Sequence, residues 1–229
     1  MIRRISQACG YRLVRRRLRW PTRHALLCAN VAEWRTPWLA FTITAVLLTT
    51  HAAANSHGGS DVLTNLIFNK EAFRAGQYWR LLTYMVRHLD WQHVLEDSVY
   101  AAVVVTLCER TFGSGITLIV FLTCGIGGAV GFLMWDIRYS SLAGSSCGTH
   151  GLFACYGLWY LFNAKNGLQA TLAVLQIAYL FYTSITAILT GYMAWPLGML
   201  SNPGYDHLCG VSAGIIWACV LRRKALGEY

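Results

Sequence analysis

Residues 114–135 read SGITLIVFLTCGIGGAVGFLMW, a stretch without a single charged side chain. A helix needs about 20 apolar residues to cross the ~30 Å hydrocarbon core of a bilayer, so this stretch predicts a transmembrane helix. With the apolar stretches on either side, the sequence predicts six such helices, at about 36–54, 90–108, 114–135, 146–163, 167–194 and 206–221. We therefore expect an all-α polytopic membrane protein whose six-helix membrane domain spans residues 36–224.

The overall composition also indicates a membrane protein. Hydrophobic residues make up 55% of the chain and charged residues 13%, whereas soluble domains carry about 25% charged residues. The formal net charge is +9, and nine arginines against one acid (Glu33) fall within the first 35 residues. This excess fits a basic N-terminal cytoplasmic tail over 1–35 better than a basic face for nucleic acid. We expect the lipid bilayer as a partner, and no nucleic acid.

The short loops indicate the orientation, because Lys and Arg accumulate on the cytoplasmic side of a membrane. Six crossings put the basic tail, the Glu109-Arg110 turn, Lys165 and Arg222-Arg223-Lys224 on one side, so both termini are expected in the cytoplasm. The segment 55–89 mixes aromatic and basic residues and is expected to lie in the membrane interface. These features fit a bacterial inner (cytoplasmic) membrane. The Arg-rich start also resembles a mitochondrial presequence, so the mitochondrial inner membrane is the alternative.

The eight cysteines form no C-x-x-C pair, and most lie within apolar stretches, where cysteine behaves as a small hydrophobic residue. The pattern therefore predicts neither a disulfide framework nor a zinc knuckle. The H-E-x-x-H motif of zinc proteases does not occur in the sequence either. We expect no cofactor and no metal ligands; the alternative of a membrane metal- or haem-binding protein rests on the histidines of the candidate site.

Unusual polar residues lie at the starts of the second, fourth and sixth predicted helices. They are His93 and Asp97, Ser146 and His150, and His207. All three helices run from the outside to the inside in the expected topology, so these side chains lie at one depth. Ionisable groups within membrane helices are costly and usually functional, which predicts one site near the outer membrane face.

A serine close to a histidine is the minimum for nucleophilic catalysis. The imidazole accepts the proton of the serine hydroxyl and later returns it to the leaving amine. A second histidine and a backbone N–H can then stabilise the tetrahedral oxyanion. On the last helix, Gly210 and Gly214 lie at i+3 and i+7 from His207, which permits close approach of a neighbouring helix.

Five short motifs resemble those of the rhomboid intramembrane serine proteases (peptidase family S54). In chain order they are Trp79-Arg80-x2-Thr83, His88-x4-His93-x3-Asp97, Glu109-x3-Gly113, Gly144-x-Ser146 and His207-x2-Gly210-x3-Gly214. The resemblance covers about 79–215 and implies a six-transmembrane-helix rhomboid-like bundle with an interfacial loop between helices 1 and 2. It also implies an endopeptidase that cleaves single-pass transmembrane substrates near the outer membrane face with a Ser–His dyad.

The resemblance implies a role for each matching residue. Ser146 would be the nucleophile and His207 the general base, with His93, Asp97 and the Ser146 amide in the oxyanion hole. Structural roles would fall to Trp79, Arg80, Glu109, Gly144, Gly210 and Gly214. His150 would pack against the base, where most rhomboids have tyrosine. The pattern Ser146-x3-His150-Gly151 is similar to the rhombosortase branch, whose substrates carry C-terminal membrane anchors that contain Gly-Gly.

Two positions depart from the family pattern. Cys147 replaces the glycine after the nucleophile, where a side chain would narrow the site. Asp97 replaces an asparagine, and an ionised carboxylate would repel a developing oxyanion. Two explanations stay open: a protonated Asp97 that donates a hydrogen bond, or an Asp97–His93 ion pair that orients His93 as a donor. The departures also leave open a catalytically inactive rhomboid-like protein that binds membrane helices.

Overall fold

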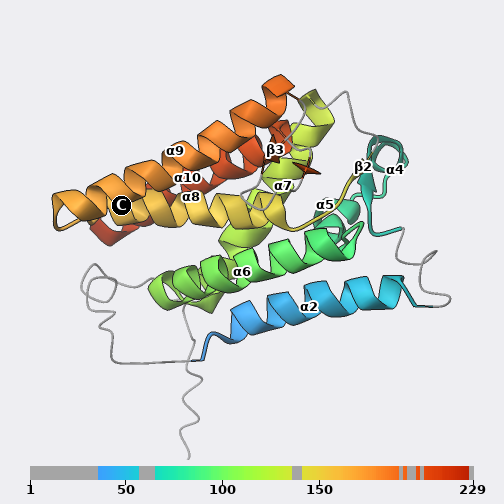
Figure 1. Ribbon diagram of the computed structural model, residues 1–229, viewed down its shortest axis with the longest axis horizontal. Helices are drawn as coiled ribbons and strands as arrows, with labels where there is room; N and C mark the ends of the chain where they lie inside the picture. The colour runs from blue at the N-terminus through green and yellow to red at the C-terminus, as the bar shows by residue number, and fades with distance from the viewer. Residues whose placement is uncertain are drawn as a thin grey trace, which may run out of the picture.

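The computed structural model describes residues 36–56, 65–135, 141–190, 193–194, 200–201 and 204–226. Six long helices account for most of these residues (Figure 1). They are α2 (Trp38–Ala54), α6 (Trp91–Phe112), α7 (Ser114–Trp135), α8 (Ser146–Phe162), α9 (Gly167–Thr190) and α10 (Tyr205–Leu226). Each of the six expected stretches overlaps one of them. The expected tail, residues 1–35, lies outside the described residues.

Three helices end away from the expected positions, and local residues explain the differences. α6 continues past 108 because no helix breaker occurs before Gly113, which has φ 83°. α9 ends at Thr190 rather than at 194, directly before Gly191 in the sequence. α10 reaches Leu226 rather than 221, because the basic residues that follow 221 are good helix formers.

The described residues are mostly helical, as expected, and two pairs of two-residue strands add to the helices. β1 (Phe68–Asn69) pairs antiparallel with β2 (Ser141–Leu142), and β3 (Met193–Ala194) pairs antiparallel with β4 (Leu200–Ser201). Part of the stretch expected in the fifth helix therefore lies in β3. The first pair joins the segment before α6 to the segment before α8, so these two parts of the chain run side by side.

The connection from α2 to α6 has structure of its own in its described part. It contains the short helices α4 (Lys70–Arg74) and α5 (Arg80–Thr83), followed by the 3-10 turn η1 (Tyr84–Val86). The Asn69 side chain caps α4 by accepting the N–H of Ala72 at 2.6 Å. Figure 1 shows these elements at the end of the bundle where α6 and α8 begin.

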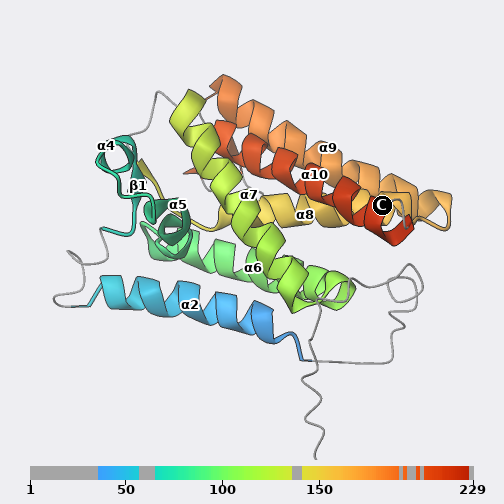
Figure 2. The same cartoon turned by 180° about the vertical axis from the view of Figure 1, so that it is seen from behind.

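α8 lies in the centre of the bundle and packs against α6, α7, α9 and α10, while α2 packs against α6 at the edge (Figures 1 and 2). Glycines allow α8 and α10 to approach closely. A Cβ on Gly210 would lie 2.5 Å from the carbonyl oxygen of Cys147, and a Cβ on Gly214 would overlap the carbonyl oxygen of Gly151. Only glycine fits at such a contact, so this spacing holds the start of α10 against the start of α8.

Some of the described helices suit a bilayer. α7 and residues Gly167–Leu189 of α9 are long and apolar enough to cross a membrane, and α2 is a shorter apolar helix. α9 exposes large apolar side chains along its length, including Leu168, Leu175 and Leu189. An extended exposed apolar surface indicates contact with lipid or with another protein rather than with water.

Candidate active site

Ser146 is the first residue of α8, and His207 lies in the first turn of α10. Nε2 of His207 is 2.7 Å from Oγ of Ser146, which is a hydrogen-bond distance. Both side chains are buried, with 8% of Ser146 and 1% of His207 exposed. The hydroxyl can therefore pass its proton directly to the imidazole, which is the arrangement that a serine nucleophile needs.

No carboxylate in the described part of the chain accepts a hydrogen bond from the His207 ring. Its Nδ1 atom is buried and has no hydrogen-bond partner among the described residues. Asp206 does not fill this place, because its Oδ1 accepts the backbone N–H of His207 at 2.8 Å. A Ser–His–Asp triad would need an acceptor at Nδ1. Among the described residues, Ser146 and His207 thus form a hydrogen-bonded pair without a third member.

His150 lies flat against the His207 ring. The two ring centroids are 4.4 Å apart and the planes differ by 16°. Nδ1 of His150 is 2.7 Å from the carbonyl oxygen of Ser146. A carbonyl oxygen only accepts, so Nδ1 of His150 carries a proton and donates it. This bond fixes the His150 ring, and the stacked ring in turn restricts the tilt of His207.

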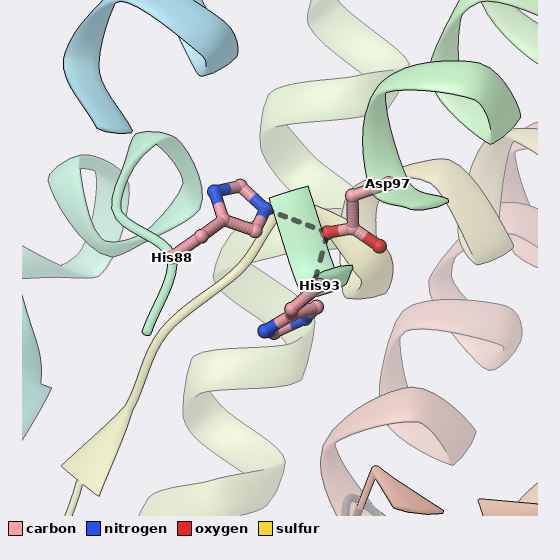
Figure 3. A group of neighbouring side chains, drawn as sticks. All are labelled: His88, His93 and Asp97. Carbon is pink, nitrogen blue, oxygen red and sulfur yellow. Dashed lines mark hydrogen bonds and ion pairs between the residues drawn. The ribbon is translucent and has the colours of Figure 1, made fainter. Parts of the chain in front are cut away.

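One carboxylate oxygen of Asp97 accepts several hydrogen bonds, of which Figure 3 shows the one from His88. Oδ2 lies 2.9 Å from Nε2 of His88, 2.8 Å from the Ser145 backbone nitrogen and 3.0 Å from Ser145 Oγ. Nε2 of His93 is farther away, at 3.9 Å. The side chains of His88 and Asp97 are both buried. Because a backbone N–H only donates, Oδ2 acts as an acceptor here.

Neither sequence-based explanation of Asp97 included His88. The geometry adds a third one, in which Asp97 pairs with His88. The His88 and His93 rings are close to perpendicular, with their centroids 4.9 Å apart. His88 and Ser145 were missing from the expected site residues. Two signals were available. His88 belongs to the motif His88-x4-His93-x3-Asp97, and a buried carboxylate in place of asparagine requires several donors or a cation.

The loop before α8 passes directly beside His93. Gly144 has φ 115°, and a Cβ there would lie 2.9 Å from two atoms of the His93 ring. The Gly144 N–H donates to the carbonyl oxygen of Tyr84 at 3.1 Å, and the Tyr84 hydroxyl donates to the carbonyl oxygen of Gly125 at 2.8 Å. Burial raises the pKa of the Tyr84 phenol, so this group stays a neutral donor. Gly144 therefore allows His93 to lie against the loop before α8.

Two further sequence candidates lie in the connection before α6. The guanidinium of Arg80 donates to the carbonyl oxygen of Ile67 at 2.7 Å, to Gln77 Oε1 at 2.7 Å and to Asn65 Oδ1 at 3.1 Å. Arg80 is buried, so these bonds hold the segment together from inside. The Trp79 side chain is 56% exposed and lies on the surface of the same segment.

Glu109 lies near the end of α6 and contacts the starts of two other helices. Its carboxylate accepts the backbone N–H of Leu39 at 3.1 Å and of Ala40 at 3.2 Å, and the Ser114 hydroxyl at 2.6 Å. The first N–H groups of a helix have no partner within the helix, and a negative charge there is favourable. Glu109 therefore caps α2 and fixes the turn into α7.

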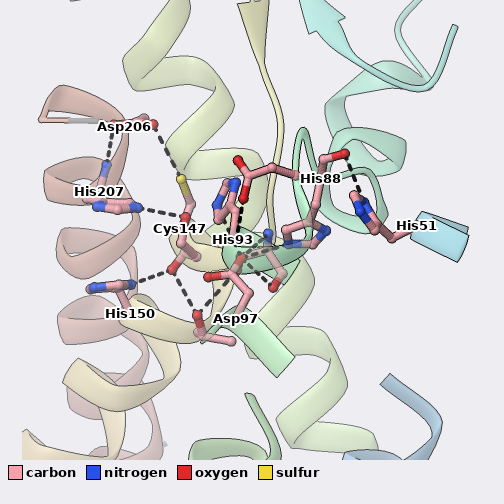
Figure 4. A network of polar contacts seen from close by, with 12 residues as sticks. His51, His88, His93, Asp97, Cys147, His150, Asp206 and His207 are labelled. Atoms are coloured by element: carbon pink, nitrogen blue, oxygen red, sulfur yellow. Dashed lines mark hydrogen bonds and ion pairs between the residues drawn. The ribbon is translucent and has the colours of Figure 1, made fainter. Parts of the chain in front are cut away.

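Cys147 packs between α7 and α10. A Cβ on Gly128 of α7 would lie 2.5 Å from the Cys147 Cβ, so the missing side chain at Gly128 makes room for the cysteine. Its Sγ is 3.8 Å from Oδ2 of Asp206, and its side chain is buried. The network in Figure 4 thus includes both residues that depart from the family pattern, Cys147 and Asp97.

Among the described residues, two groups of side chains could hold a metal ion, whereas the sequence patterns predicted none. One consists of His88, His93 and Asp97; the other consists of Cys147, Asp206 and His207. In each group the ligand atoms lie within 4.8 Å of one another. The second group shares His207 with the dyad.

Comparison with known proteins gives the family. The model of the Rhomboid domain matches residues 75–224. The rhomboid protease GluP of Bacillus subtilis (strain 168) is 25% identical over 154 residues, which cover 67% of this chain but only 28% of GluP. "Putative rhomboid protease YdcA" of the same organism is 24% identical over 152 residues, or 65% of this chain and 71% of YdcA. The match over more than half of the chain confirms the resemblance of the motifs: this protein belongs to the rhomboid family.

Proposed function

We propose that this protein is an intramembrane serine endopeptidase in which Ser146 is the nucleophile and His207 the general base. The proposal is carried by one observation, the 2.7 Å contact between Ser146 Oγ and His207 Nε2 at the buried starts of α8 and α10. Membership of the rhomboid family and two relatives named as rhomboid proteases support it. The family and the apolar helices together make the chain a membrane protein.

In the first step, Ser146 Oγ attacks the scissile carbonyl carbon while Nε2 of His207 takes the hydroxyl proton. The carbonyl electrons move onto oxygen, and this oxyanion needs donors. Ser146 is the first residue of α8, so its N–H has no acceptor within the helix and lies at the positive end of the helix dipole. His93, beside the Gly144 loop, supplies the second donor.

In the second step, the carbon–nitrogen bond breaks and the leaving amine takes the proton from His207. Water then attacks the acyl-enzyme, with His207 again as base, and Ser146 is released. The imidazole must keep one orientation throughout these transfers. The stacked His150 ring and its bond to the Ser146 carbonyl oxygen support that orientation.

Asp97 contributes to the oxyanion hole as a positioning residue. Its Oδ2 binds His88 and both donors of Ser145, so it connects the segment before α6 to the residue that precedes the nucleophile. The repulsion expected from a carboxylate is reduced because these donors face its charge. Asp97 thereby holds His93 and the Ser146 amide at a fixed separation.

The membrane arrangement is part of the proposal. The six long helices cross the bilayer, with both termini in the cytoplasm and the segment 55–89 in the outer interface. The dyad then lies near the outer face, where water reaches it from that side. A bacterial inner membrane is the proposed location, because the basic excess within residues 1–35 fits a cytoplasmic tail. The mitochondrial inner membrane is the alternative, because the same Arg-rich residues resemble a presequence.

The proposed substrates are single-pass transmembrane proteins. A helical backbone cannot present its carbonyl to a recessed serine, since its carbonyl groups are hydrogen-bonded within the helix. Substrates with small or helix-breaking residues near the scissile bond are therefore favoured. C-terminal anchors that contain Gly-Gly, as for the rhombosortase branch, meet this condition.

The test uses the purified full chain in liposomes with labelled single-pass substrates, one of which carries a Gly-Gly anchor. Ser146→Ala and His207→Ala are expected to abolish cleavage, whereas Ser212→Ala, at an exposed position of α10, serves as a matched control that retains it. Undiminished cleavage by the Ser146→Ala protein would refute the assignment. Binding of the substrates without cleavage by the unmodified protein would instead favour the inactive rhomboid-like alternative.

A further inference from the structure

Cys147, Asp206 and His207 form a compact group that proteolysis does not use as a whole. Their sulfur, carboxylate and ring-nitrogen atoms lie within 4.8 Å of one another, and all three residues are buried. Cys147 Sγ and Asp206 Oδ2 are 3.8 Å apart, a long and weak contact. Figure 4 shows the sulfur of Cys147 between Asp206 and His207. A thiol, a carboxylate and an imidazole are therefore close enough together to bind one metal ion.

The donor set is that of zinc. Zn²⁺ binds thiolate, imidazole and carboxylate together, usually with tetrahedral geometry. Mg²⁺ and Ca²⁺ prefer sites made of oxygen ligands alone, whereas this group also contributes a sulfur and a nitrogen atom. Zn²⁺ with one thiolate and one carboxylate has no net charge, which matters in a buried site because an uncompensated charge there is costly. A water molecule would supply the fourth ligand of a tetrahedral site.

A second observation distinguishes this group from the His88–His93–Asp97 group. In that group, Asp97 Oδ2 already accepts hydrogen bonds from His88 and from both donors of Ser145, so an ion would have to displace them. Nδ1 of His207 and Nδ1 of His88 are both buried without a hydrogen-bond partner among the described residues, so an unpaired ring nitrogen favours both groups, and the hydrogen bonds of Asp97 are what distinguishes them. A polar atom left unpaired in this way gains from a ligand.

We infer that Cys147, Asp206 and His207 form an inhibitory zinc site. On binding, the aqueous ion exchanges water ligands for the three side chains, and the Cys147 thiol releases its proton to water. If the ion binds Nε2 of His207, it occupies the lone pair that accepts the Ser146 proton. If it binds Nδ1, the neutral ring carries its proton on Nε2. In both cases His207 no longer acts as a base, and cleavage stops. The inhibition therefore rests on the proposed function, whereas the binding of zinc does not.

The binding test uses the purified full-length Ser146→Ala protein, which keeps all three ligands. Titration with Co²⁺ alone should give the thiolate-to-cobalt absorption band at one ion per chain, and Zn²⁺ should displace it. Cys147→Ser and Asp206→Asn, which preserve side-chain size, should each weaken binding on the order of tenfold or more. Cys219→Ala, which removes an exposed thiol on the same helix as His207, is the control and should change nothing.

The activity test measures cleavage against Zn²⁺ concentration for the unmodified chain and the Cys147→Ser chain. Zinc should abolish cleavage by the former, and the concentration for half inhibition should rise on the order of tenfold or more in the latter. A thiolate–cobalt band that survives Cys147→Ser, or equal zinc sensitivity of the two chains, overturns the site. Absence of proteolysis in every chain counts against the proposed function alone, because the cobalt titration still decides the metal site.

Discussion

Replacing Gly210 with alanine tests whether the close packing of α10 on α8 sets the geometry of the dyad. The added Cβ would lie 2.5 Å from the carbonyl oxygen of Cys147, whereas an ordinary contact begins at 3.4 Å. The backbone oxygen cannot move away within α8, so α10 must shift by about 0.9 Å. If this shift falls along the Ser146–His207 hydrogen bond, its length grows from 2.7 Å to about 3.6 Å, beyond hydrogen-bond range.

A displacement of about 1 Å at the reacting groups costs about 100-fold in rate, or roughly 2.7 kcal/mol in the activation free energy. We therefore expect Gly210→Ala to lower kcat by about 100-fold with little change in KM. The assay is steady-state cleavage of a labelled single-pass substrate in liposomes. Gly115→Ala is the matched control, because a Cβ on Gly115 of α7 meets nothing within 4 Å. Equal kcat values for the Gly210→Ala and unmodified proteins would refute the reasoning.

Three further substitutions test other contacts of the site. Asp97→Ala removes the acceptor shared by His88 and Ser145 and should lower kcat/KM on the order of 100-fold. Asp97→Asn keeps an acceptor for Ser145, and its kcat/KM should stay within about tenfold of the unmodified protein. Equal losses in the two variants would contradict the positioning role. His150→Ala removes the ring stacked on His207 and should reduce kcat rather than KM, while His150→Tyr should retain most activity. Glu109→Ala removes the cap of α2 and should lower the free energy of unfolding by about 1–2 kcal/mol, measured as a lower thermal midpoint in detergent with unchanged kcat at low temperature.

The long helices could be predicted from the sequence because their signal is additive over many residues. The stretch 114–135 is apolar throughout, and the helix boundaries coincide with it. The proximity of Ser146 and His207 followed from topology, since both lie in the first turn of helices that run in the same direction. Glycines spaced for close helix contact supported the same arrangement.

The contacts made by loops could not be predicted in the same way. The two-residue strand β1 lies far along the chain from β2, and no periodic pattern marks so short a pair. His88 lies outside the regular helices, so its position relative to Asp97 depends on the packing of the whole connection before α6. The direction of the Cys147 side chain depends on space left by Gly128 on another helix. These features arise from tertiary packing, which local sequence does not encode.

The β1–β2 pair has a consequence for the lengths of the loops around the nucleophile. Leu142 is held in register with Phe68, and only residues 143–145 separate it from Ser146. One inserted or deleted residue in this interval would either break the pairing, since a slip of one residue reverses the faces of a strand, or rotate Ser146 away from His207. Related proteins should therefore show no length variation between Leu142 and Ser146. Insertions and deletions should instead fall before Ser141, where the chain can change length without moving Ser146.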